Sequence, residues 1–232
     1  MSSRRFKSRC ATCGMTDVLC LCAVIPVLKT ETRLIVLMHW RETKTTTNTA
    51  RLATLALRNS ELRIRGLEGE SMSTDGLVDP DRQSLYLYPS DDARELTREY
   101  ARSFGKPITL IVPDGSWKQA SKVKSRISEL DCVPCVKLPS GKPSEYQLRQ
   151  SPHAESVSTF EAIARAMGIL EGQEVERPLE FLFKTMVDRI LWARGKLSPD
   201  ACTGGLPEVA RDRGTLRDPG QLARLLHSQA AK

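Results

Sequence analysis

The 232-residue sequence contains no run of 18 consecutive apolar residues, which excludes a membrane-spanning helix. It begins with the basic segment Met1–Lys7, and no apolar core of a signal peptide follows this segment. We find no internal repeat. These absences predict a cytoplasmic protein without a membrane partner.

Positive charge is in excess. The net charge is +7 and the isoelectric point is about 9.1, which suits a polyanionic partner. Basic residues recur at positions 4, 5, 7 and 9, across 118–126 and in the tail. This distribution favours nucleic acid as the partner over a merely solvated basic surface.

Seven cysteines in a chain expected to be cytosolic indicate metal binding or chemistry rather than disulfides. Four of them, Cys10, Cys13, Cys20 and Cys22, follow the pattern C-x2-C-x6-C-x-C. Two close pairs of thiolates can complete a tetrahedral zinc shell with no open position, so the predicted site is structural. A set of free thiols is the alternative, although such a dense cluster would oxidise easily without a metal.

Cys132 and Cys135 form a second C-x2-C, in a segment whose alternation indicates a strand. We expect buried strand thiols here rather than metal ligands. A mixed site that combines Cys132 and Cys135 with Cys10 and Cys13 stays open. Cys202 is isolated in a polar region.

The segment Pro107–Ala120 predicts a short buried strand, a tight Asp-Gly turn and a helix that begins at Ser116. The helix is expected to run through the basic residues Lys118, Lys122, Lys124 and Arg126. In open α/β sheets, ligands bind just outside the carboxyl ends of the strands. Asp114, Ser116 and Trp117 therefore lie where a ligand would be held. An ordinary strand–helix corner with a helix cap is the alternative.

Elsewhere the patterns alternate between strands and helices. Strands are predicted at 33–38, 62–65, 84–88 and 133–138, and helices at 52–57, 91–104, from 159 and over 178–193. This alternation indicates an α/β fold with a largely parallel sheet. The loop 139–149 is too long for a simple connection, which is typical of functional loops. We divide the chain into a zinc-binding segment 1–28, a catalytic domain 29–195 and a basic, mostly irregular tail 196–232, and favour a monomer.

Five sequence blocks, in order over roughly residues 8–195, resemble the DTW-domain family, the tRNA-uridine aminocarboxypropyltransferases. They are the cysteine cluster; His39-Trp40-Arg41-Glu42 with Asn48-Thr49-Ala50-Arg51-Leu52; Tyr88-Pro89-Ser90; Asp114-Gly115-Ser116-Trp117; and Leu148-Arg149 with Ser158-Thr159-Phe160-Glu161-Ala162. Trp40 stands where the family usually has proline, and Ser116 replaces the threonine of the D-G-T-W signature. Serine keeps the hydroxyl group.

The resemblance implies a SPOUT-like fold whose carboxyl-terminal part forms a trefoil knot around S-adenosylmethionine. It implies transfer of the 3-amino-3-carboxypropyl group of this donor to N3 of a tRNA uridine, with release of methylthioadenosine. Sequence periodicity does not indicate a knot. A SPOUT-type RNA methyltransferase and a non-catalytic zinc-containing RNA-binding protein are the competing interpretations.

For the reaction, Asp114 is our candidate base for the uracil N3 proton, together with Ser116 and Trp117 in the same turn. A role of Asp114 in capping or orienting is weighed equally. Trp117 is suited to stacking on a base or adenine, with a core position as the alternative.

The donor is expected to contact Pro113, Leu138, Arg149, Ser158, Thr159 and Glu161. Among these, Arg149 suits its carboxylate, while Glu161 or Ser158 suits its ammonium group. Lys118, Lys122 and Lys124 are expected to bind RNA. Asn48 and Arg51 are expected to bind phosphate or to position Asp114, and His39 is expected to be structural.

Overall fold

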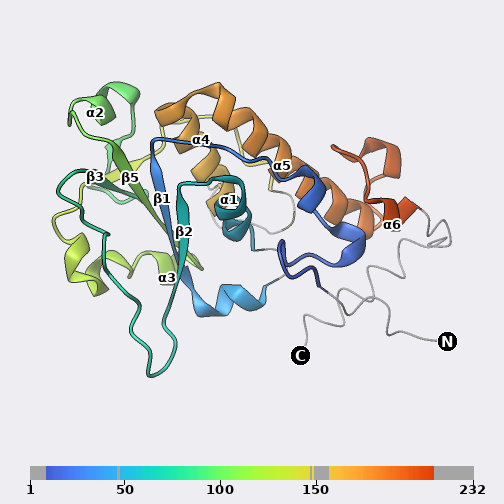
Figure 1. Cartoon of the computed structure of the whole chain (residues 1–232), viewed down its shortest axis with the longest axis horizontal. Helices are drawn as coiled ribbons and strands as arrows, with labels where there is room; N and C mark the ends of the chain where they lie inside the picture. Colours follow the sequence, from blue (N-terminus) through green and yellow to red (C-terminus); the bar gives the residue numbers. More distant parts are fainter. Residues whose placement is uncertain (1–8, 46–47, 147, 149–156, 212–232) are drawn as a thin grey trace.

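A computed structural model describes residues 9–45, 48–146, 148 and 157–211 (Figure 1). Its centre is a six-stranded sheet with the order β2-β1-β5-β3-β6-β4, in which every pairing is parallel. The strands are β1 (Arg33–His39), β2 (Ser60–Arg65), β3 (Gln83–Leu87), β4 (Arg94–Glu95), β5 (Ile108–Asp114) and β6 (Cys135–Lys137). The predicted α/β fold with a mostly parallel sheet is therefore confirmed.

Both faces of the sheet are covered, which explains the continuous apolar runs in its central strands. One face, with Leu34, Val36 and Val112, packs in the larger core with residues of α1 (Ala50–Ala56), α4 (Thr159–Glu171) and α5 (Gln173–Ala193). In Figure 1 the orange helices α4 and α5 lie beside the strands. The other face, with Ile35 and Ile111, packs in a smaller cluster. All seven residues of β5 are buried as a result.

Helix α4 begins at a capping box. The Ser158 hydroxyl accepts a hydrogen bond from the Glu161 N–H at 3.3 Å, and Glu161 Oε2 accepts one from the Ser158 N–H at 2.8 Å. Helix α5 begins five residues before the expected start and includes Pro178. Gly172, with φ of 115°, separates α4 from α5. Burial of Val175 on the same side as Leu179 explains why α5 extends towards Gly172.

The expected helix over 91–104 is wrong in its first half. The structure has strand β4 there, followed by the short helix α2 (Arg98–Arg102). The Leu96 N–H donates to the Lys137 carbonyl at 2.8 Å, so a partner about 40 residues further along the chain fixes this segment. Thr97 then caps α2 through Oγ1, which accepts from the Tyr100 N–H at 3.1 Å.

The expected basic helix over 118–126 is also wrong. Helix α3 (Trp117–Ala120) has four residues, and 3-10 turns at Lys124–Arg126 and Ser128–Leu130 follow. The buried residues Ala120 and Val123 are three positions apart, as are Leu130 and Val133. Bonds from i to i+3, such as Val123 N–H to the Ala120 carbonyl at 3.1 Å, keep such residues on one side. The lysines consequently do not share one helical face.

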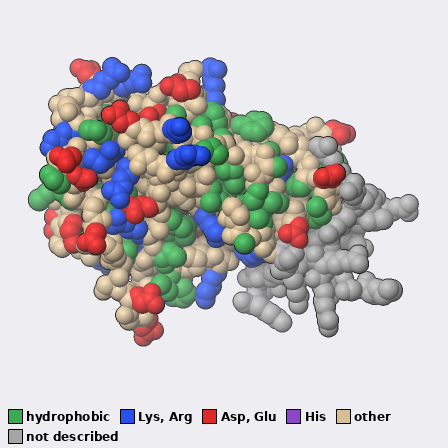
Figure 2. All heavy atoms as spheres, viewed as in Figure 1, with side chains coloured by type: hydrophobic (Ala, Val, Ile, Leu, Met, Phe, Trp, Pro, Cys, Tyr) green, Lys and Arg blue, Asp and Glu red, His purple; other side chains and the backbone are tan. Residues whose placement is uncertain are grey.

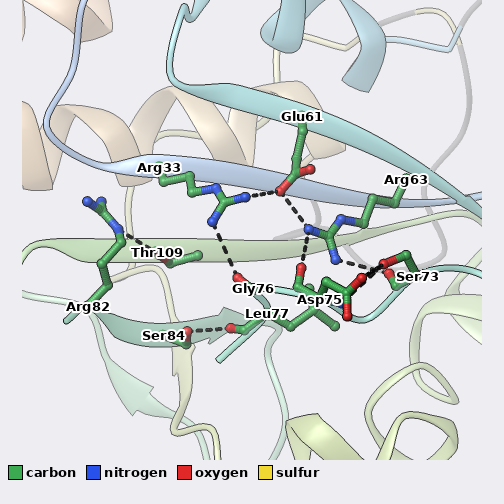
Figure 3. A network of polar contacts seen from close by, with 10 residues as sticks. All are labelled: Arg33, Glu61, Arg63, Ser73, Asp75, Gly76, Leu77, Arg82, Ser84 and Thr109. Atoms are coloured by element: carbon green, nitrogen blue, oxygen red, sulfur yellow. Dashed lines mark hydrogen bonds and ion pairs between the residues drawn. The ribbon is translucent and has the colours of Figure 1, made fainter. Parts of the chain in front are cut away.

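A network of arginines holds the segment 73–84 against the sheet (Figure 3). Arg33 and Arg63 both contact Glu61 Oε1, at 2.7 and 2.8 Å. Arg63 also donates to the Ser73 and Asp75 carbonyls at 3.0 and 2.7 Å. Arg82 donates from Nε to Thr109 Oγ1 at 3.0 Å. We call Arg33, Arg63 and Arg82 the closed arginine network.

Beyond Lys196, the described part of the chain includes the 3-10 turn Pro199–Ala201 and the helix α6 (Glu208–Arg211). Cys202 and Leu206 are buried in the larger core, so the polar surroundings expected for Cys202 are wrong. None of the described helices is long and apolar enough to cross a bilayer. The expected trefoil knot stays a prediction, since residues 147 and 149–156 lie outside the described residues.

Candidate active site

Asp114 ends β5 at the carboxyl edge of the sheet, in register with Met38 of β1. Its side chain is 5% exposed and accepts a hydrogen bond from Asn48 Nδ2 at 2.7 Å. The other end of the Asn48 amide, Oδ1, accepts from the Arg51 N–H at 3.4 Å, at the start of α1. The amide therefore joins the beginning of a helix to the buried carboxylate, which fixes the position of Asp114.

A cavity of about 1160 Å³ opens beside Asp114. Three segments form much of its wall: the Asp114–Trp117 turn, the loop after β6 and the start of α4. The structure brings together several residues predicted for the site, since the wall includes Asn48, Pro113, Asp114, Trp117, Leu138, Ser158 and Thr159. Trp117 is 39% exposed, and its ring centroid lies 6.2 Å from that of Tyr88. Trp117 therefore packs against Tyr88 and still presents part of its ring at the cavity wall.

Ser116 and Glu161 act differently from the lining residues. The Ser116 N–H donates to Gln119 Oε1 at 2.8 Å, so Ser116 begins α3. Glu161 is buried and accepts from Ser144 Oγ at 2.7 Å and from the Glu145 N–H at 2.8 Å, in addition to the helix cap. Glu161 therefore holds the loop after β6 against α4, behind the cavity wall.

The residues predicted to bind RNA do not form one surface. Lys118 and Lys122 are exposed, whereas Lys124 Nζ donates to the Val133 carbonyl at 2.8 Å. Arg51 Nη2 donates to the Ala11 carbonyl at 3.0 Å, within the cysteine segment. On the face in Figure 2, Lys and Arg are interspersed with Asp and Glu. Arg149, predicted to bind the donor carboxylate, lies outside the described residues.

Sequence reasoning missed part of the cavity wall. Lys137, Lys142 and Arg165 also line it, as does Glu42 on the opposite side. The length of the loop 139–149 indicates a functional loop, but no local sequence pattern indicates which of its side chains face the cavity. Arg165 lies two turns into α4 and carries no distinctive signal in the sequence.

The four amino-terminal cysteines form a compact sulfur cluster. All four Sγ atoms lie within 4.8 Å of one another, with 3.4 Å between Cys10 and Cys22 and 3.8 Å between Cys13 and Cys20. The Cys13 backbone N–H, the Cys22 thiol and the Thr12 N–H lower the pKa of Cys10 to about 6, which makes it a thiolate at neutral pH. The donor set and spacing fit one soft metal ion, because tetrahedral zinc places its sulfurs about 3.8 Å apart.

The second cysteine pair takes no part in this cluster. Cys135 is buried in β6, where its sulfur accepts from Ser90 Oγ at 3.0 Å and donates to the Tyr88 carbonyl at 3.3 Å. Cys132 is exposed. The expectation of a buried strand thiol holds for Cys135, and among the described residues no mixed site with Cys10 and Cys13 forms.

A buried carboxylate and an aromatic-walled cavity at the carboxyl edge of a parallel sheet are typical of α/β proteins that bind a ligand at this edge. The sequence matches the DTW domain over residues 7–191. The chain therefore belongs to the DTW-domain family, as its sequence blocks predict.

Proteins of similar sequence include tRNA-uridine aminocarboxypropyltransferases of a plant and an insect. The chain is 31% identical over 209 residues to tRNA-uridine aminocarboxypropyltransferase A of Arabidopsis thaliana, covering 77% of this chain and 79% of that protein. It is 28% identical over 193 residues to tRNA-uridine aminocarboxypropyltransferase 2 of Drosophila melanogaster, covering 78% and 76%. Among solved structures, the SAM-dependent rRNA:acp-transferase Tsr3 from Vulcanisaeta distributa is similar with a TM-score of 0.46 and 19% identity, over 86% of this chain and 99% of that one.

Proposed function

We propose that this protein is a tRNA-uridine aminocarboxypropyltransferase that uses S-adenosylmethionine as donor. Family membership and the names of its relatives support the class of reaction. The observation that carries the proposal is the buried Asp114 carboxylate, held by Asn48 at 2.7 Å on the wall of a cavity large enough for a nucleoside.

Asp114 serves as the base in this proposal. A protonated uracil imide is a poor nucleophile, so its N3 proton has to move to a group within hydrogen-bond reach. The uridine N3 then forms a bond to the γ-carbon of the donor, and the bond from that carbon to sulfur breaks. Sulfur keeps the electron pair and loses its positive charge, which gives methylthioadenosine. Asn48 orients the Asp114 carboxylate for this transfer.

The donor occupies the rest of the cavity. Pro113 and Leu138 contribute walls for adenine and ribose, and Trp117 offers an aromatic face beside them. Ser158 and Thr159, at the start of α4, are suited to the polar amino-acid end of the donor. Glu161 contributes indirectly, since it fixes the loop that closes this end of the cavity.

The sulfur cluster is proposed to hold a structural zinc ion through Cys10, Cys13, Cys20 and Cys22. A bound zinc ion with four protein ligands supplies folding stability and has no open position for substrate. Val18, Leu19 and Leu21, which lie between the two cysteine pairs or within the second, are buried in the larger core. Metal binding here is therefore expected to fix the segment that Arg51 contacts beside the site.

Replacing Asp114 tests the proposal. Asp114→Asn keeps the shape and an oxygen that can accept from Asn48, but it removes the charge and the basicity. We expect turnover of unmodified tRNA to fall about 10²-fold or more, the size of a general-base contribution. Affinity for S-adenosylmethionine, measured by calorimetry, is expected to change far less. Near-wild-type turnover would leave Asp114 with a structural role only.

The nucleoside by-product separates the competing functions. The wild-type protein with unmodified tRNA is expected to release methylthioadenosine, detected by mass spectrometry. Adenosylhomocysteine would instead identify a methyltransferase. No by-product under conditions where both substrates bind would favour a non-catalytic RNA-binding protein.

A further inference from the structure

The carboxyl edge of the sheet continues past the cavity onto a second polar surface. His39, the last residue of β1, is in register with Arg65, the last residue of β2. Asp114 lies on the neighbouring strand β5, in register with the residue before His39. Nucleic acid that extends from Asp114 along this edge of the sheet, towards β1 and β2, would therefore pass close to His39 and Arg65.

His39 is fixed between this surface and the Asp114 turn. Its Nδ1 accepts from the Arg41 N–H at 3.2 Å and lies 3.3 Å from Gln119 Nε2. Burial lowers the pKa of His39, and the positive charges of Arg65, Arg41 and Arg126 lower it further. The imidazole is consequently neutral at pH 7, and the three arginines whose charges act on it belong to three different segments.

These arginines differ in how they are paired. Arg65 Nη2 donates to the Gln119 carbonyl at 2.9 Å, while its buried Nε has no hydrogen-bond partner. Within residues 9–45, 48–146, 148 and 157–211, no carboxylate lies in ion-pair distance of Arg41, Arg65 or Arg126. The charge of Asp114, on the cavity wall, raises the pKa of Arg65, but its carboxylate lies beyond ion-pair distance. Positive charge at this place is therefore left for an external anion.

An aromatic side chain lies within the same surface. Trp40 is half-buried, with the Arg41 guanidinium carbon 5.5 Å and Lys44 Nζ 5.0 Å from its ring centroid. Its ring stacks beside that of His39 with centroids 6.1 Å apart. Cations next to a half-exposed aromatic ring suit a single nucleic-acid strand, because cations bind its phosphates and the ring stacks on its bases.

We propose that Trp40, Arg41, Lys44, Arg65 and Arg126, the rim patch, bind the tRNA strand that flanks the target uridine. Arg65 and Arg126 contact a phosphate, and Trp40 stacks on a neighbouring base. This inference rests on the proposed function, because the acceptor N3 has to reach Asp114. N3 lies on the pairing edge of uracil, so the target uridine has to be unpaired when N3 reacts, and unpaired RNA segments are those whose bases stack on aromatic side chains. The rim patch, rather than the lysines of 118–124, is then the main RNA surface.

Charge-matched variants test the rim patch. Arg126→Ala removes an exposed rim charge, and Arg58→Ala removes an exposed charge just before the amino end of β2. Affinity for unmodified tRNA is measured without donor at several salt concentrations. Arg126→Ala is expected to weaken binding several-fold at low salt and to reduce the slope of log affinity against log salt by about 1. Arg58→Ala is expected to leave both unchanged.

Trp40 tests the stacking step separately. Trp40→Ala is expected to weaken tRNA binding about 10-fold without changing the salt slope, while Trp40→Phe keeps most of the affinity. Calorimetry with S-adenosylmethionine and thermal melting show whether each variant is folded. Wild-type affinity and slope in Arg126→Ala, together with wild-type affinity in Trp40→Ala, would overturn the rim patch.

These measurements also distinguish a failure of the rim-patch proposal from a failure of the proposed function on which it rests. If the wild type modifies tRNA but the rim variants bind normally, the reaction stands and the RNA surface lies elsewhere. If the variants lose tRNA affinity but the wild type forms no methylthioadenosine, RNA binding at the rim stands and the proposed reaction is wrong.

Discussion

Two groups of arginines near the sheet differ in what surrounds them. In the closed arginine network, Arg33 and Arg63 share the Glu61 carboxylate (Figure 3). Arg82 donates to three oxygens of the chain, the Thr109 hydroxyl and the Glu31 and Ile108 carbonyls. In the rim patch, no carboxylate within the part of the chain that the structure describes forms an ion pair with Arg65. The first group uses its charge for the fold, whereas we propose that the second uses its charge for the RNA strand.

Arg63 and Arg65 show how small the difference in sequence is. Both belong to β2 and, two residues apart, point to the same face of the strand. Arg63 meets the carbonyls of the segment 73–75, while Arg65 is at the strand end, beside Gln119. The net charge of +7 therefore does not locate the RNA surface, and our proposal for it rests instead on the partners of each arginine.

The largest effect on stability is expected at Arg189, which, like the closed arginine network, donates to groups of the chain itself. This α5 residue is 3% exposed, donates to the Gly205 carbonyl at 2.8 Å and also contacts the Cys20 carbonyl of the sulfur cluster. Arg189→Met leaves buried carbonyls without a donor, so we expect about 3 kcal/mol less stability. Chemical denaturation measures this change in the free energy of unfolding.

The same variant tests the link to the metal. Wild-type protein is expected to contain about one zinc per chain, and Arg189→Met is expected to lose it faster to a chelator. Cys20→Ser/Cys22→Ser is the positive control for loss of metal. Unchanged stability and unchanged metal release in Arg189→Met would show that α5 does not support the cluster.

A smaller effect is expected at Arg82. It donates to Thr109 Oγ1 at 3.0 Å and to the Glu31 and Ile108 carbonyls at 2.8 and 2.6 Å. Arg82→Ala is expected to cost about 2 kcal/mol, a fall in Tm of roughly 4–8 °C for a chain of this size, with tRNA affinity unchanged. Arg126→Ala, matched in charge, should change stability by less than about 0.5 kcal/mol. A larger loss of stability in Arg126→Ala than in Arg82→Ala would remove the distinction between the closed arginine network and the rim patch.

Much of this fold follows from local signals. β1 and β5 are apolar over their length because both of their faces are covered, and the Ser158–Glu161 capping box predicts the start of α4. By contrast, the sequence at 94–96 has no local pattern that indicates pairing with β6. A helical propensity there is overridden by a non-local partner.

The residues of the candidate site also divide into those that a sequence motif predicts and those that it does not. The Asp114 turn, Asn48 and Ser158 belong to short motifs, and the structure brings them to one cavity. Arg65 and Arg126 belong to no motif, and the charge of Arg126 acts on Arg65 across elements that are far apart in the sequence. Short sequence motifs therefore predict site residues that lie in one turn or helix start, but not residues that the fold brings together from distant segments.

The smallest expected effect concerns the protonation of His39. Burial and the charges of Arg65, Arg41 and Arg126 lower its pKa in the folded protein. The unfolded chain, with an ordinary histidine pKa near 6.5, thus binds more protons at mildly acidic pH, and stability falls as the pH drops below about 6.5. Removing Arg126 takes away one repulsive charge, so Arg126→Ala should raise the pKa of His39 in an NMR titration, with His39→Gln to assign the signal. Arg58→Ala should leave it unchanged. An unshifted His39 in Arg126→Ala would show that Arg126 stands too far from His39 to share one phosphate with Arg65, and would reduce the rim patch to the β1 and β2 ends.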